Sequence, residues 1–271
     1  MNRYYPRLIL AAAAVAVLSY LPALADTRIE KTLKLDSGGK LTLLADAGSV
    51  TVTGSSSSGA RVVLTSDKND FDSRFDLKFE ELPGELRITM KKKESLSSWS
   101  SWFNNSKIRF EIQVPTKTST DLQTGGGHVK LLSMEGEASL ETSGGHIEVD
   151  DVEGNLLAET SGGHIEIHGA KGRVDADTSG GHVEVSFAKG NAHGGRIESS
   201  GGGITVAVDP NVDLSIDAST SGGTVRNDIP ITVVGKVKGS SIKGTLGKGG
   251  ETLYVHTSGG SVSLGAVGAA N

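Results

Sequence analysis

The sequence predicts an all-β protein, most of which is a parallel β-solenoid with about 18 residues per coil. The first observation is a repeat, since the core T-x-G-G begins at Thr124, Thr142, Thr160 and Thr178, eighteen residues apart. The second is the alternation of apolar and polar residues after each copy, which indicates strands. The third is composition, because 37 of 271 residues are glycine and only 4% are aromatic. Repeat proteins need few large side chains, since each coil buries only a thin aliphatic strip.

Residues 1–25 are predicted to be a signal peptide. A short basic start with Arg3 and Arg7 precedes the apolar run LILAAAAVAVLSYLPALA, and Ala23-Leu24-Ala25 is a small-x-small cleavage site. The apolar run is short for a membrane span, and Pro22 interrupts it. An uncleaved anchor is the alternative. We therefore expect an exported chain without a membrane span after cleavage, in the periplasm, on the cell surface or outside the cell.

The composition of the exported chain, namely its lack of cysteine and its net negative charge, excludes some kinds of site and partner. It contains no cysteine, which excludes disulfides and thiolate metal sites. Loss of Arg3 and Arg7 with the signal peptide takes the formal net charge from −5 to −7. This acidic balance argues against nucleic acid as a partner.

Residues 26–120 are predicted to hold the N-terminal coils and an antiparallel cap. The segments DSGGKLTL at Asp36 and DAGSVTV at Asp46 are looser copies of the repeat. RFDLKFEELPGELRITMKKK predicts a strand, a Pro-Gly turn and a second strand, and KIRFEIQVP predicts a third. We expect these strands to form an antiparallel meander over the first coil, because an open terminal coil exposes unpaired backbone groups.

Residues 121–271 are predicted to be the solenoid of 18- to 21-residue repeats. Each repeat reads as two short strands, with Gly-Gly at one corner and Glu153-Gly154 or Lys171-Gly172 at the other. Equivalent strands of successive coils then lie parallel, about 4.8 Å apart. The alternation directs one aliphatic set into the core, comprising Val129, Leu131, Ile147, Val149, Ile165, Ile167, Val183, Val185, Leu140, Ala158 and Ala176.

The later repeats are less regular. They begin at Ser199, Thr220 and Thr257, after intervals of 21, 21 and 37 residues. The last interval is close to two coils, so we expect GSSIKGTLGKGG to be a degenerate coil between two regular ones. About eight coils from Asp121 to Leu264 predict a rod roughly 40 Å long.

Several segments together resemble a known family. They are DAGSVTVTG, a charged antiparallel segment that ends in RFEIQVP, LQTGGGHVKL, the repeated TSGGHIEV, and the closing IKGTLGKGGETLYVHTSGGSVSL. Over nearly the whole exported chain the sequence resembles the bacterial putative-adhesin family of unknown function called the DUF4097 domain. The resemblance implies an exported or surface β-solenoid with a right-handed coil. It implies no catalytic residues.

The histidines of the repeat are candidate metal ligands. His128, His146, His164 and His182 recur at one outward position, and Glu148, Glu166 and Glu184 recur two residues later. Imidazole and carboxylate suit Zn²⁺, Cu²⁺ or Ni²⁺, whereas a flat sheet face presents ligands in parallel instead of converging. The alternative is a solvated position copied by duplication. We also expect the glutamate column to raise the pKa of the histidines above about 6.5.

Two other features are candidates for binding or catalysis. Trp99, Trp102 and Phe103 lie among serines and asparagines, as in surfaces that bind sugars or proteins, or else they plug the first coil. The pairs Asp150/Asp151 and Asp175/Asp177 are the nearest match to the carboxylates of a glycosidase, but acidic residues in turns are usually only solvated.

The sequence thus favours a non-enzymatic, exported β-solenoid that acts as a surface or periplasmic binding module without a cofactor. The expected partner is a protein or polysaccharide of the cell envelope. Two alternatives remain open: a carbohydrate-active β-helix enzyme, and an envelope metal-binding protein that uses the histidine and glutamate columns.

Overall fold

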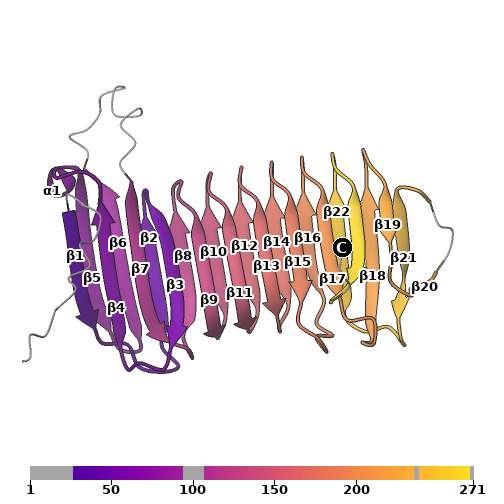
Figure 1. The fold of residues 1–271 in the computed structure, drawn as a ribbon, viewed down its shortest axis with the longest axis horizontal. Helices are drawn as coiled ribbons and strands as arrows, with labels where there is room; N and C mark the ends of the chain where they lie inside the picture. The colour runs from indigo at the N-terminus through magenta and orange to yellow at the C-terminus, as the bar shows by residue number, and fades with distance from the viewer. Residues whose placement is uncertain (1–26, 94–106, 235–237, 269–271) are drawn as a thin grey trace, which may run out of the picture.

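The computed structural model describes residues 27–93, 107–234 and 238–268, and this part of the chain is all-β apart from one four-residue helix, α1 (Phe71–Arg74). The strands form two large sheets of eleven and twelve strands (Figure 1). Most neighbouring strands are parallel, and antiparallel pairs lie toward the ends of both sheets. The sequence prediction of an all-β chain with parallel strands is confirmed at this level.

Each central repeat contributes one strand to each sheet. Strand pairs of successive repeats are in register eighteen residues apart, as in Ile147↔Ile165 and Leu140↔Ala158. The second sheet contains β8 (Ser119–Thr124), β10 (Ala138–Thr142), β12 (Leu156–Thr160), β14 (Val174–Thr178) and β16 (Gly195–Ser199). The first sheet contains β9 (Val129–Glu135), β11 (Ile147–Glu153), β13 (Ile165–Ala170), β15 (Val183–Phe187) and β17 (Ile204–Val208).

The core lies between the two sheets. All eleven aliphatic residues predicted to point inward are at most 2% exposed. Alternation along each strand places the polar residues on the outer faces, which run the length of the molecule without a covering layer (Figure 1).

The C-terminal strands do not stack in sequence order. Here the chain forms β18 (Leu214–Thr220), β19 (Val225–Asn227), β20 (Thr232–Val233), β21 (Ser241–Leu246), β22 (Thr252–Thr257) and β23 (Val262–Ala266). Strand β22 lies between β16 and β18, and β23 lies between β17 and β19. The prediction of a degenerate coil in GSSIKGTLGKGG is wrong, because this segment forms β21, which pairs antiparallel with β18. The Thr257 and Thr220 repeats are therefore direct neighbours.

The N-terminal strands show a matching insertion. They are β1 (Thr27–Leu33), β2 (Lys40–Ala45), β3 (Ser49–Ser55), β4 (Ala60–Ser66), β5 (Phe75–Leu82), β6 (Glu85–Lys92) and β7 (Ile108–Pro115). Strand β2 lies between β8 and β6, and β3 lies between β9 and β7. The predicted hairpin of β5 and β6 is confirmed, but β7 belongs to the other sheet. The three strands therefore do not form one meander, because β7 pairs parallel with β3 and antiparallel with β4 in the first sheet.

Three successive repeats have a residue with left-handed backbone conformation at the same position of the first-sheet strand. Ser133, Asp151 and Gly169, eighteen residues apart, have φ of 55°, 53° and 72°. Residues 133 and 151 are skipped in the β9–β11 ladder, and the β13–β15 ladder shifts at Gly169. Asp151 thus has a backbone role in a bulge, where left-handed φ is required.

Candidate functional site

The threonine of the repeat fastens each Gly-Gly corner to the preceding repeat. The hydroxyl Oγ1 of Thr160 donates to the carbonyl of Gly145 at 3.0 Å and accepts the backbone N–H of Gly163 at 3.2 Å. Thr142 and Thr178 make the same two bonds in their own repeats. Because these threonines are at most 5% exposed, their hydroxyls supply bonds that water cannot supply.

The second glycine of each corner is required by close packing. A Cβ at Gly163 would overlap the carbonyl oxygen of Gly145, and the same holds for Gly145 over Gly127 and Gly181 over Gly163. The first glycine of the same corner, Gly162, has open space around it. Only the second glycine therefore brings successive backbones into contact.

The four histidines form a continuous column at this corner. The first three accept the backbone N–H of the next histidine on their Nδ1 atoms, at 3.2 Å from His146 to His128 and at 2.8 Å from His164 to His146 and from His182 to His164. The rings of His146 and His164 stack with centroids 4.8 Å apart and planes 2° apart. At the start of the column, Ser49 Oγ accepts the N–H of His128 in the same way.

These bonds determine the tautomer of the neutral rings. A ring nitrogen that accepts an N–H carries no proton, so a neutral histidine here has its proton on Nε2. Burial, followed by the neighbouring His128 and His164, lowers the pKa of His146, and Glu166 only partly opposes this. The prediction that the glutamate column raises the histidine pKa is therefore wrong for His146. Desolvation and like neighbours outweigh a solvated carboxylate.

The predicted metal ligands lie in adjacent columns and do not converge. Glu148, Glu166 and Glu184 are paired in register across β11, β13 and β15, and Glu148 also bonds Lys130. Within the described ranges, no group of three or more His, Asp or Glu side chains is arranged to hold a metal ion. In this tautomer Nε2 carries the ring proton, so a metal at either ring nitrogen would have to displace the Nδ1 hydrogen bond.

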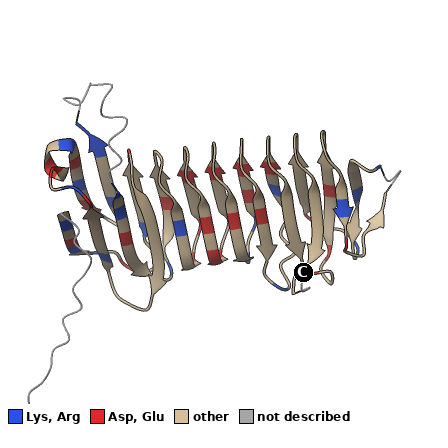
Figure 2. Cartoon of the chain, turned by 45° about the horizontal axis from the view of Figure 1, so that its top comes forward, with Lys and Arg blue, Asp and Glu red and all other residues tan. Residues whose placement is uncertain are grey.

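The middle of the molecule is strongly acidic. Between residues 119 and 209 the chain has five Lys or Arg and fifteen Asp or Glu. The acidic residues form bands across the middle strands, while Lys and Arg gather toward the ends (Figure 2). On the second sheet, Asp177 is paired in register with Glu198, and burial followed by this neighbour raises the pKa of Asp177.

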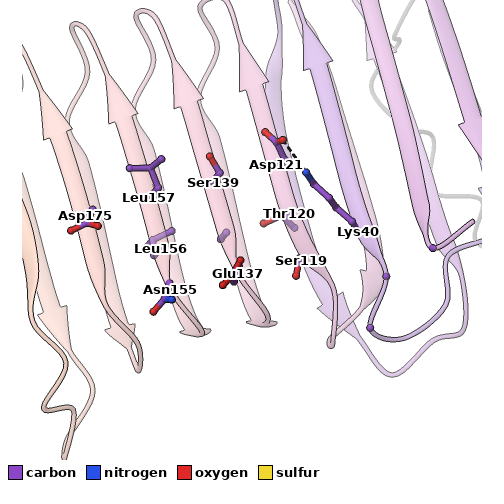
Figure 3. A pocket seen from close by; sticks show the side chains of 14 residues that line it. Lys40, Ser119, Thr120, Asp121, Glu137, Ser139, Asn155, Leu156, Leu157 and Asp175 are labelled. Atoms are coloured by element: carbon purple, nitrogen blue, oxygen red, sulfur yellow. Dashed lines mark hydrogen bonds and ion pairs between the residues drawn. The ribbon is translucent and has the colours of Figure 1, made fainter. Parts of the chain in front are cut away.

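A shallow groove of about 530 Å³ crosses β2, β8, β10, β12 and β14 on the outer face of the second sheet. Figure 3 shows its two rows of side chains, one with Ser119, Glu137 and Asn155 and one with Asp121, Ser139, Leu157 and Asp175. The second row is in register from strand to strand, so it offers one side chain per repeat. We call these seven residues the repeat groove.

Most charges of the repeat groove are neutralised locally. Lys40 Nζ lies 3.2 Å from Asp121, and Arg173 binds both carboxylate oxygens of Asp175 at 2.9 and 3.1 Å. Leu157 is 40% exposed between these polar groups. The groove therefore presents hydroxyl, amide and aliphatic surface with little uncompensated charge. Sequence reasoning singled out only Asp175 of these seven residues, as a candidate glycosidase carboxylate, because a row of mixed outward residues has no periodic signal.

A second depression, also of about 530 Å³, lies on the first sheet beside the histidine column. It is lined by Arg109, Glu111, Lys130, Glu148 and three of the histidines, among other residues. Its charges are closely mixed, and the Lys130–Glu148 pair spans it. Because the positive and negative side chains on this face lie next to each other, they attract a charged ligand weakly, and the face suits a ligand that forms hydrogen bonds better.

Some predicted features lie outside the described residues. These are the signal peptide at 1–25 and the aromatic residues Trp99, Trp102 and Phe103. Among the described helices, none is long and apolar enough to span a membrane.

The chain was compared with solved structures, curated proteins and family descriptions. Solved structures similar to the chain include a putative cell adhesion protein from Clostridium sporogenes (16% identity, 89% of this chain and 99% of that one, TM-score 0.40). A second is a putative adhesin from Bacteroides fragilis (11% identity, 89% of this chain and 97% of that one, TM-score 0.39). A third is a putative lipid binding protein from Parabacteroides distasonis (15% identity, 88% of this chain and 96% of that one, TM-score 0.38). No curated protein matches the chain.

One family description matches, and it covers residues 40–241, about three quarters of the sequence. The matched segment includes β2 to β20 and thus the repeat groove and the histidine column. The chain belongs to the family described as "Putative auto-transporter adhesin, head GIN domain" (DUF2807).

Proposed function

We propose that this protein is an exported, non-enzymatic adhesin-like module that binds an extended polymer of the cell envelope. The observation that carries the proposal is the repeat groove, an open and shallow groove that runs across five parallel strands in a member of a family described as putative adhesins. In this proposal residues 1–25 are a signal peptide, and the protein acts in the periplasm or at the surface. The repeats are wound as a right-handed β-solenoid, as the resemblance to the DUF4097 domain implies.

The chemistry of the groove favours a long, hydrogen-bonding ligand. One outward side chain recurs per repeat, at the spacing of about 4.8 Å that separates neighbouring strands. A polymer that lies along the row can therefore make similar contacts at each step. Since Asp121 and Asp175 are already paired, selection depends on hydrogen bonds with Ser139 and Asn155, on hydrogen bonds that Glu137 accepts, and on contact with Leu157.

The test compares two sheet faces. The variant Ser139→Arg/Leu157→Arg blocks the repeat groove, and Ser186→Arg on β15 places a similar side chain on the opposite sheet as a control. We would measure binding to immobilised envelope polysaccharide and, separately, to envelope protein extract. We expect the groove variant to lose at least tenfold in binding to one of them, while Ser186→Arg binds like the unmodified protein.

Two results would overturn the proposal. One is that the unmodified protein binds neither preparation. The other is that the groove variant and the control lose binding equally, which would place the contact outside the groove.

A further inference from the structure

At one end of the molecule, two long strands each have one edge without a partner strand among the described residues. Strand β1 closes the first sheet with seven residues and β5 closes the second with eight, and both lie at the same end (Figure 1). At the opposite end the closing strands β19 and β20 have only three and two residues. A long open edge presents backbone N–H and C=O groups that can pair with another strand.

The side chains at this end are incompletely covered. Ile29, Leu33, Leu77 and Phe79 pack against the core but remain partly exposed. Natural edge strands are usually short or covered, because an open apolar edge invites association. This combination of free backbone groups and half-covered apolar residues indicates an interface.

The two edges are aligned with each other. Lys31 Nζ lies 5.2 Å from the centroid of the Phe79 ring, and the N–H of Lys34 donates to Glu81 at 2.7 Å. From the first contact to the second, the residue number rises on both sides, from Lys31 to Lys34 and from Phe79 to Glu81. The two strands therefore run the same way, and Ile29 lies opposite Leu77.

Each edge carries a self-complementary charge pattern centred on these two residues. In β1 the order is Arg28-Ile29-Glu30, and in β5 it is Asp76-Leu77-Lys78. Antiparallel pairing of two identical strands about Ile29 sets Arg28 opposite Glu30 of the second copy, twice. Pairing about Leu77 sets Asp76 opposite Lys78 of the second copy in the same way.

One two-fold axis satisfies both edges. An axis through Ile29 and Leu77, perpendicular to the sheets, relates β1 to its copy and β5 to its copy at once. Within a single copy, Arg28–Glu30 lie 3.0 Å apart and Lys78–Asp76 lie 3.4 Å apart, with side chains 42–64% exposed. Arg28, Asp76 and Lys78 can exchange their same-strand pairing for pairing across the interface. Glu30 also accepts a hydrogen bond from Arg61 of β4 at 2.8 Å, which leaves its other carboxylate oxygen for Arg28 of the second copy.

We propose that two copies of this chain join end to end, so that both sheets continue across the junction through β1–β1 and β5–β5 pairing. The dimer is an isologous rod about twice as long as the single chain, with the repeat grooves of the two copies on one continuous sheet. This arrangement goes beyond the polymer-binding function and does not depend on it.

The principal test uses two variants in which opposite members of each charge pair are reversed. Variant one carries Arg28→Glu and Asp76→Lys, and variant two carries Glu30→Arg and Lys78→Asp. Each variant places like charges opposite each other in its own dimer, whereas a one-to-one mixture restores every pair. Sedimentation and small-angle scattering should show a long dimer for the unmodified protein, monomers for each variant, and dimers again in the mixture.

Cross-linking provides a second measurement that does not depend on charge. The chain has no cysteine, so Ile29→Cys introduces a single thiol on the proposed axis. Directly opposed Cβ atoms in antiparallel strands lie close to disulfide range. We expect Ile29→Cys to form a covalent dimer on mild oxidation, and Lys31→Cys, which faces Thr27 of the second copy, to remain uncrosslinked.

Circular dichroism would confirm that all variants fold, since the four charged side chains are exposed. A monomeric unmodified protein would overturn the proposal. So would dimers that survive in both charge variants, or a mixture that stays monomeric. A dimer with equal cross-linking at positions 29 and 31 would show a different register or a different face.

Discussion

At the residue scale, the histidine of the repeat acts as an acceptor in the backbone ladder. His128, His146 and His164 each receive an N–H from the next repeat, and Ser49 does the same with a hydroxyl. The histidines and Ser49 share a side-chain hydrogen-bond acceptor at the corner. This explains why a serine can occupy, in β3, the position that histidine occupies in the later repeats. Periodicity correctly predicted that these residues face outward, but it could not show that the Nδ1 atoms are already engaged.

This role predicts that His146→Ala destabilises the fold. The variant leaves the N–H of His164 without its acceptor, at a cost of about 1 kcal/mol. The matched control is His182→Ala, because Gly203 follows in that column and donates no hydrogen bond to His182 among the described contacts. Urea denaturation should show the larger loss for His146→Ala. An equal loss for both variants would mean that the hydrogen bond to Nδ1 of His146 does not contribute measurably to stability.

The lowered pKa of His146 predicts a direction for pH dependence. The unfolded chain takes up a proton near the reference value of 6.5, while the folded ring resists it until the pH is lower. Stability is therefore full above about pH 6.5 and falls as the pH drops toward the folded pKa. His146→Gln removes this titration, so its stability should fall less between pH 7 and 5. A steeper fall in His146→Gln would contradict the direction.

At the element scale, the corner geometry distinguishes the two glycines of T-S-G-G. The sequence predicted corners, yet it did not distinguish the two glycines, because both suit a turn. The structure does so through close approach, since only the second glycine touches the carbonyl of the preceding repeat.

The difference predicts unequal effects of alanine at the two positions. Gly163→Ala forces a methyl group into the Gly145 carbonyl and should destabilise the fold by about 1–3 kcal/mol or more. Gly162→Ala meets open space and should change stability by less than about 0.5 kcal/mol. Thermal and urea unfolding of the two variants measure this directly. Comparable losses would show that turn conformation, and not contact between repeats, selects glycine.

At the scale of the whole molecule, the sequence predicted the repeat and its core better than the order of the repeats. The inward aliphatic residues are buried as expected, because alternation depends only on local sequence. The insertion of β2–β3 and β22–β23 between other strands was not predictable. Every T-x-G-G copy presents nearly the same backbone and the same core residues, so local sequence does not specify which copy lies beside which.

The inserted order makes the C-terminal segment an internal part of the fold. Leu253, Val255, Val262 and Leu264 are at most 2% exposed between strands on both sides. Burial of each contributes about 1.5–3 kcal/mol, so the four together match the total stability of a typical domain. Truncation before Glu251 should therefore release β18 to β21 as well, although all four strands remain in the chain.

Hydrogen exchange distinguishes this order from sequential stacking. In the intact protein, amides of β22 and β23 should exchange as slowly as those of β16, since both of their edges are paired. In the truncated chain, β18 should lose protection while β12 and β14 keep it. If repeats were stacked in sequence order, the truncation would remove only a terminal coil, and β18 would stay protected. Retained protection in β18 would therefore refute the placement of β22 and β23 between earlier strands, and with it the dependence of β18 to β21 on these two strands.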